Sequence, residues 1–204
     1  MYRHIIWDFD GTLFDTYPVM AGVFKELLES EGMIESVETI EKQWRISASH
    51  ALSYYQDKYK IDDAFIADYK RKKLAAEMEQ SKPFAEIEAL CKYIASTGRK
   101  NYLLTHRGES SIELLRKYDL ERYFSQCITS KEGFARKPSP AAIHHLMSEH
   151  QIEKTEAIMI GDRDLDLISG KNAGISACYF TNESEGNEHC DYIIHDFKQL
   201  YSII

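Results

Sequence analysis

The sequence predicts an α/β protein, a parallel sheet with helices on both faces, that carries an inserted all-helical segment. From residue 82 onward, short apolar runs alternate with helical stretches of about ten residues, which is typical of βαβ units. A further apolar run, Ile5-Ile6-Trp7, stands near the N-terminus. Between these regions the apolar residues follow helical spacing, with no convincing β-run. We therefore expect a core domain of residues 1–15 and 82–204 and a helical domain of residues 16–81.

Four helices are expected in the inserted segment. Gly32 is placed to end the first, while Ser47 and Asp62 are placed to cap the third and the fourth at their N-termini. Apolar side chains recur every three or four residues, so each helix has one face for burial. These positions are Met20, Phe24, Leu27 and Leu28; Val37, Ile40 and Trp44; Ala51, Leu52, Tyr55 and Tyr59; and Phe65, Tyr69, Leu74 and Met78.

The second part of the core is expected to begin with a helix that starts at Pro83 and ends at Gly98. Because the strands of a parallel sheet end at one edge, residues that follow them should meet in one ligand site. The expected strands are residues 101–105, 126–129, 156–160, 176–180 and 192–194. The expected helices are residues 109–118, 139–149, 165–173 and 197–203.

Composition limits the possible partners and compartments. The 204 residues carry a formal net charge of −8, which does not favour a nucleic-acid partner. The four cysteines are far apart and lack zinc-site spacing, as expected for reduced thiols of a cytosolic protein. The sequence enters its first strand directly, with no room for a signal peptide, and has no apolar run of membrane-spanning length. We expect a cytoplasmic protein with no membrane partner; its oligomeric state cannot be derived from the sequence.

Two carboxylates, Asp8 and Asp10, follow the first apolar run. Strand alternation would start both on one side, and burying two acidic groups together is costly without a cation. Hard oxygen ligands suit Mg²⁺. Gly11 allows a tight turn close to a ligand, and Thr12 adds a hydroxyl and an N–H group.

Later strand ends supply complementary groups. Thr105 offers a hydroxyl, and the N–H groups that follow, including that of His106, can face an anion. Lys137 precedes Pro138 in a stretch stiffened by two prolines, so that a fixed ammonium could offset the repulsion between a carboxylate and a phosphate. Asp162 and Asp166 follow the strand at 156–160, and Asp164 between them is expected to cap the next helix. For Arg107, a position on the solvated surface is favoured over contact with a substrate.

In this order, these motifs resemble those of the haloacid dehalogenase (HAD) superfamily, whose core is Rossmann-like. The resembling branch carries a helical cap and includes phosphoglycolate phosphatases and β-phosphoglucomutases. The resemblance implies that Asp8 is a nucleophile that becomes phosphorylated and that Asp10 is the general acid and base. It also implies phosphate or substrate binding by Gly11, Thr12, Thr105, His106 and Lys137. Mg²⁺ would be held by Asp8, Asp162 and the backbone carbonyl of Asp10, while Asp166 would hold Lys137 or a metal-bound water.

Several functions remain open within this resemblance. We expect a Mg²⁺-dependent phosphatase that hydrolyses a small phosphorylated metabolite, phosphoglycolate-like or a sugar phosphate. A phosphomutase of the β-phosphoglucomutase type and a catalytically silent, regulatory or binding member are the alternatives. Asp10 argues against a dehalogenase, and no lysine of the insert has the context expected of a phosphonatase. The physiological substrate does not follow from the sequence, and neither do the cap residues that select it.

Overall fold

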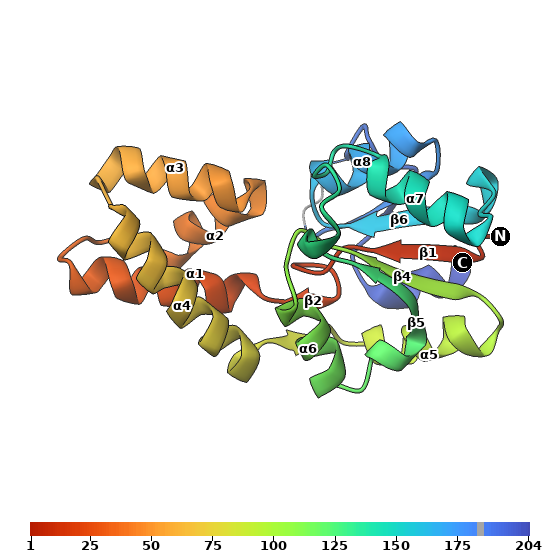
Figure 1. Ribbon diagram of the computed structural model, residues 1–204, viewed down its shortest axis with the longest axis horizontal. Helices are drawn as coiled ribbons and strands as arrows, with labels where there is room; N and C mark the ends of the chain where they lie inside the picture. Colours follow the sequence, from red (N-terminus) through yellow and green to blue (C-terminus); the bar gives the residue numbers. More distant parts are fainter. Residues whose placement is uncertain (183–185) are drawn as a thin grey trace. The chain divides into compact units, whose positions relative to one another are not determined.

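The central sheet of the protein has six parallel strands in the order β5-β4-β1-β6-β7-β8 (Figure 1). The computed structural model describes residues 1–182 and 186–204. The predicted α/β class and the predicted core strands are confirmed, with ends that differ by a few residues. The strands are β1 (His4–Trp7), β4 (Lys100–Leu104), β5 (Phe124–Ile128), β6 (Ala157–Gly161), β7 (Ser176–Phe180) and β8 (Tyr192–Ile194).

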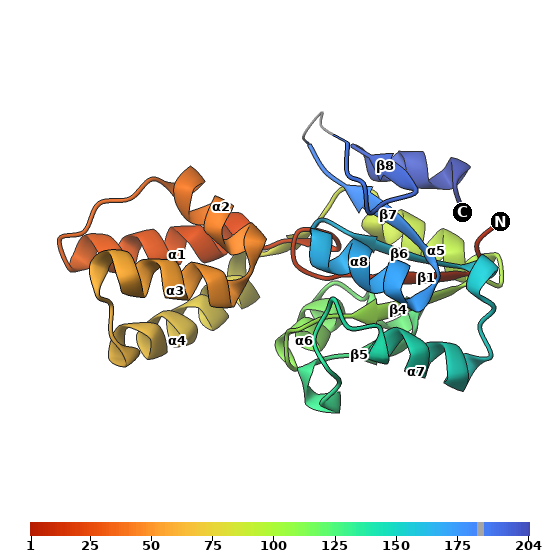
Figure 2. The same cartoon turned by 90° about the horizontal axis from the view of Figure 1, so that it is seen from above.

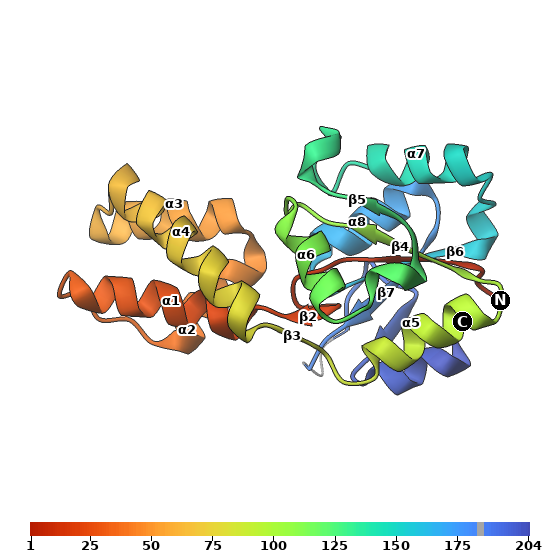
Figure 3. The same cartoon turned by 60° about the horizontal axis from the view of Figure 1, so that its bottom comes forward.

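Helices cover both faces of this sheet, as Figures 2 and 3 show. One face carries α7 (Ala141–His150) and α8 (Asp164–Ala173), and the other carries α5 (Ile87–Ser96), α6 (Ser110–Lys117) and the 3₁₀ helix η4 (Phe197–Ser202). Shorter 3₁₀ turns are η1 (Glu121–Tyr123), η2 (Ser130–Glu132) and η3 (Lys154–Glu156). Among the described residues, none of the helices combines the length and the apolar character needed to cross a bilayer.

The middle of the sheet explains why β1 appears in the sequence as an uninterrupted apolar run. Ile5, Ile6 and Trp7 are fully buried, since β1 lies between β4 and β6 with side chains packed on both faces. Ile6 joins a cluster with residues of α7, while Trp7 lies on the other face, with its ring centre 6.3 Å from that of Phe197. This burial fixes β1, and so fixes where Asp8 emerges from the sheet.

The helical residues between β2 (Phe14–Asp15) and β3 (Lys82–Pro83) form a compact unit of their own. Contacts divide the chain into Met1–Phe14 with Pro83–Ile204 and a second unit, Asp15–Lys82. The second unit has four helices, as predicted: α1 (Tyr17–Ser30), α2 (Val37–Ile46), α3 (Ala48–Tyr59) and α4 (Asp63–Gln80).

An aromatic cluster forms the centre of the helical unit. The ring of Phe24 lies 5.0 Å from those of Trp44 and Tyr69 and 4.8 Å from that of Tyr55, measured between ring centres. Both predicted caps are present: the Ser47 hydroxyl accepts from His50 N, and the Asp62 carboxylate accepts from Phe65 N.

Two predictions about local structure are wrong. Pro83 does not start a helix but lies in β3, which pairs with β2, and α5 begins only at Ile87. The N–H of Phe84 donates to the carbonyl of Leu13, which keeps this stretch extended, and Glu86 turns the chain with a φ of 71°. Leu74, expected in the core, is 46% exposed; the buried residues of α4 are Ile66, Glu77 and the predicted Tyr69.

Candidate active site

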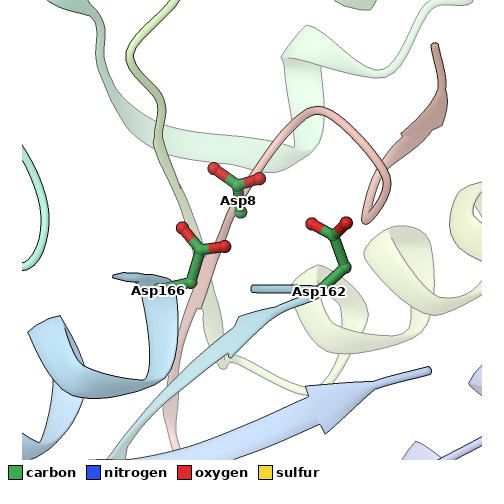
Figure 4. Close-up of side chains that lie close together, drawn as sticks. All are labelled: Asp8, Asp162 and Asp166. Carbon is green, nitrogen blue, oxygen red and sulfur yellow. The ribbon is translucent and has the colours of Figure 1, made fainter. Parts of the chain in front are cut away.

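Three aspartates meet beyond the carboxyl ends of β1 and β6 (Figure 4). Asp8 follows β1, Asp162 follows β6, and Asp166 stands in the first turn of α8. Trp7 and Ile160 are register partners in the two adjacent strands, so the carboxylates that come next emerge side by side. One carboxylate oxygen from each lies within 4.8 Å of the others, and all three residues are buried. Such a cluster requires positive charge.

The buried side chain of Lys137 supplies part of that positive charge. Its Nζ lies 2.5 Å from Asp8 Oδ1 and 2.5 Å from Asp166 Oδ1, and donates to the carbonyl of Leu104 at 3.0 Å. The Lys137 side chain is 1% exposed. The contact expected between Asp166 and Lys137 is therefore present, and it joins the cluster to the end of β4.

The pKa values of these groups diverge because their surroundings differ. Burial and the neighbouring Asp166 raise the pKa of Asp8 to about 6, although Lys137 and Arg163 oppose the shift. Burial acts in the same upward direction on Asp166, but Lys137 and Arg163 outweigh it and hold the pKa of Asp166 below its ordinary value. Burial alone would lower the pKa of Lys137, whereas Asp166 and Asp8 raise it, so its ammonium stays charged.

Arg163 was not predicted at the site, yet its guanidinium borders all three aspartates. Its Nε lies 3.4 Å from Asp166 Oδ2 and 4.0 Å from Asp162 Oδ1, and its Nη2 lies 3.5 Å from Asp8 Oδ2. The cap predicted for Asp164 is wrong, because α8 already includes this residue and Arg163 takes the capping position without a side-chain cap bond. The Asp164 carboxylate instead accepts from Asn187 Nδ2 at 2.7 Å.

Asp10 belongs to a different ion pair from Asp8. The Nη1 of Arg107 donates to Asp10 Oδ1 at 2.9 Å, and the Arg107 side chain is 8% exposed. The guanidinium carbon also lies 5.2 Å from the centre of the Phe9 ring. The expectation that Arg107 is solvated is therefore wrong. Gly11, with a φ of 75°, turns the chain directly after Asp10.

The hydroxyls expected to meet a phosphate are both buried near the cluster. Thr12 Oγ1 donates to Asp162 Oδ1 at 3.4 Å, and Thr105 Oγ1 accepts from the N–H of Arg107 at 3.1 Å. The N–H of Gly11 donates to the carbonyl of Phe14 at 2.8 Å. Phosphate binding by these residues stays a prediction.

His106 is placed to hold Lys137. Its Nε2 accepts from the backbone N–H of Lys137 at 2.8 Å. Burial and the positive charges of Lys137, Arg136 and Arg163 lower the pKa of His106 to about 3. The ring is therefore neutral near pH 7, as an acceptor must be. Substrate binding by His106 stays a prediction.

Comparison with known proteins places this arrangement in a family. The family model described as "Haloacid dehalogenase-like hydrolase" matches residues 5–180. The chain belongs to the haloacid dehalogenase-like hydrolases. A relative named pyrophosphatase PpaX, from Halalkalibacterium halodurans, is 22% identical over 98% of this chain and 95% of its own. A relative named phosphoglycolate phosphatase, from Aquifex aeolicus, is 25% identical over 84% of this chain and 81% of its own.

A solved structure shows the same fold. The crystal structure of a hydrolase from Streptococcus pneumoniae TIGR4 is 30% identical to this chain and superposes with a TM-score of 0.69. The match covers 88% of this chain and 93% of that one. The family resemblance found in the motifs is thus confirmed by comparison of the whole sequence and of the fold.

Proposed function

We propose that this protein is a Mg²⁺-dependent phosphatase that hydrolyses a small phosphorylated metabolite through a phosphorylated Asp8. The family match and the phosphatase names of the relatives support an enzyme of this class. The observation that carries the proposal is the environment of Asp8: a buried carboxylate with the Lys137 ammonium on one oxygen and the Asp162 carboxylate close by.

The residues at the cluster fit a hard divalent cation. Asp8 and Asp162 offer carboxylate oxygens, which Mg²⁺ prefers, and the two strands bring them together before any metal arrives. The backbone carbonyl of Asp10 would be a further ligand, while Asp166 is already occupied with Lys137. When bound, the cation would supply positive charge to the phosphate and to the nucleophile.

The side chains then divide the reaction between them. Asp8 attacks phosphorus and forms an acyl phosphate as the leaving oxygen departs. Lys137, fixed by Asp166 and by the Leu104 carbonyl, offsets repulsion between the attacking carboxylate and the phosphate. Asp10 gives a proton to the leaving oxygen and later takes one from the water that cleaves the acyl phosphate. Arg107 fixes one oxygen of Asp10 and so sets the direction of its carboxylate.

The names of the relatives, which include phosphoglycolate phosphatase and pyrophosphatase PpaX, support a proposal for the class of substrate. We infer a small phosphorylated metabolite, and we assign its selection to the helical unit of residues 16–81 acting as a cap over the core. We also infer a cytoplasmic location, in keeping with four free cysteines.

The proposal is tested with a generic phosphoester such as p-nitrophenyl phosphate, with Mg²⁺ and with a chelator. Phosphate release should require Mg²⁺ and should fall to the background rate in Asp8→Asn. Asp164→Asn is the matched control, because Asp164 lies between Asp162 and Asp166 in the sequence but its carboxylate bonds Asn187 instead of joining the cluster. Release that persists in Asp8→Asn, or that ignores the chelator, would contradict the mechanism.

A further inference from the structure

Two cations border the acidic cluster in the part of the chain that the structure describes. Lys137 and Arg163 lie against the three carboxylates of Asp8, Asp162 and Asp166. The two cations are held differently. Lys137 is 1% exposed and locked between two aspartates and a carbonyl, whereas the Arg163 side chain is 15% exposed and borders the cluster at 3.4 to 4.0 Å.

Arg163 also lies beside the oxygens that a metal would use. Its nearest approaches to Asp8 and Asp162 are to Asp8 Oδ2 and to Asp162 Oδ1. Lys137 takes the other oxygen of Asp8, so Oδ2 is the one left for a metal or for attack. A divalent cation and the Arg163 guanidinium would share one set of buried carboxylates. They would repel each other strongly, because water screens buried charges little.

We propose that Arg163 is the resident counter-cation of the metal-free cluster and that a divalent cation must displace its guanidinium from Asp8 and Asp162. This inference rests on the metal site of the proposed function but not on the phosphatase reaction. Arg163 precedes α8 in extended backbone, with φ −135° and ψ 154°. Its long side chain is partly exposed, so it can turn outward without moving the helix. The guanidinium thereby sets the metal concentration at which the site fills.

The test is a calorimetric titration of metal-free protein with MgCl₂, and separately with MnCl₂, in the absence of substrate. Arg163→Met keeps an unbranched apolar stem and removes the charged guanidinium, so it should bind either metal about tenfold or more tightly than the wild type. Arg163→Lys keeps a positive charge, so its metal affinity should lie between those of the wild type and Arg163→Met. Arg136→Met removes an exposed charge that precedes Lys137 and should change affinity less than about twofold.

Thermal unfolding supplies a second readout and checks that each variant folds. Without metal, Arg163→Met should melt below the wild type, because Lys137 alone then faces three carboxylates. Saturating Mg²⁺ should raise its melting temperature more than it raises that of the wild type. Equal affinities for wild type and Arg163→Met, or weaker binding by the variant, would overturn the proposal and leave the phosphatase function standing. Binding of neither metal by any of these proteins would overturn the metal site itself.

Discussion

Replacing Lys137 by methionine tests whether one ammonium holds the acidic cluster together. The substitution keeps the volume of the side chain and removes a charge that contacts both Asp8 and Asp166 at 2.5 Å. Removing one partner of a buried ion pair leaves the other uncompensated and costs about 3–5 kcal/mol. We expect a loss of that size in the free energy of unfolding of the core unit at pH 7 with metal chelated.

The pH dependence of this loss has a definite sign. Without the ammonium, the pKa values of Asp8 and Asp166 rise, and the folded state takes up protons before the unfolded chain does. Acidification therefore stabilises the variant relative to the wild type, and the difference between them should shrink from pH 7 to pH 5.

Urea unfolding followed by tryptophan fluorescence measures the effect. The chain has two tryptophans, Trp7 in the core unit and Trp44 in the helical unit, so a Trp44→Phe background reports on the core alone. Lys131→Met is the control, since the Lys131 side chain is 62% exposed and its pair with Glu109 lies in water, so its loss should change the free energy of unfolding far less. A loss below about 1 kcal/mol for Lys137→Met, or one that stays constant with pH, would refute the reasoning.

Two further substitutions probe the support of the site. The folded-state pKa of His106, about 3, lies below its ordinary 6.5, so the unfolded chain protonates first as pH falls. Partial exposure of the ring reduces this effect. Between pH 7 and pH 5, the free energy of unfolding of the wild type should still fall on the order of 1 kcal/mol more than that of His106→Gln. Equal falls for the two proteins, measured by urea unfolding, would contradict this. At Gly161, an added Cβ would lie 2.3 Å from Asp166 Cβ, so Gly161→Ala should lower stability by about 1–3 kcal/mol in thermal unfolding. At Gly22 an added Cβ would meet nothing within 4 Å, so Gly22→Ala should not lower stability. Equal melting temperatures for the two variants would exclude the clash at Gly161.

The fold was predictable wherever burial produces a regular pattern of apolar residues in the sequence. Residues 5–7 of β1 and the residues of β6 are apolar because both faces of these strands are covered, and the caps at Ser47 and Asp62 use side chains whose chemistry is local. β2 and β3 have only two residues each, too few for any period, and their pairing joins segments that are distant in the sequence. Pro83 fits a helix start equally well when only local rules are applied, and that is why its strand was missed.

The site was predictable where position along a strand determines it. A carboxylate that follows a buried parallel strand must emerge at the ligand edge, so Asp8 and Asp162 could be placed together before the structure was known. The partners of the two arginines could not be placed in this way. A guanidinium reaches several ångströms from its backbone, and its destination depends on which buried carboxylates the fold leaves undercompensated.

The arginines also account for the different roles that we propose for two aspartates two residues apart. Asp8 shares the cluster with Lys137 and Arg163, whereas Asp10 is held by Arg107. A nucleophile and a proton carrier need different surroundings, because one must stay charged and the other must change its charge during the reaction. Separate cations provide those surroundings within a single loop. Arg107 and Arg163 thus give the two carboxylates the separate surroundings that their proposed roles require.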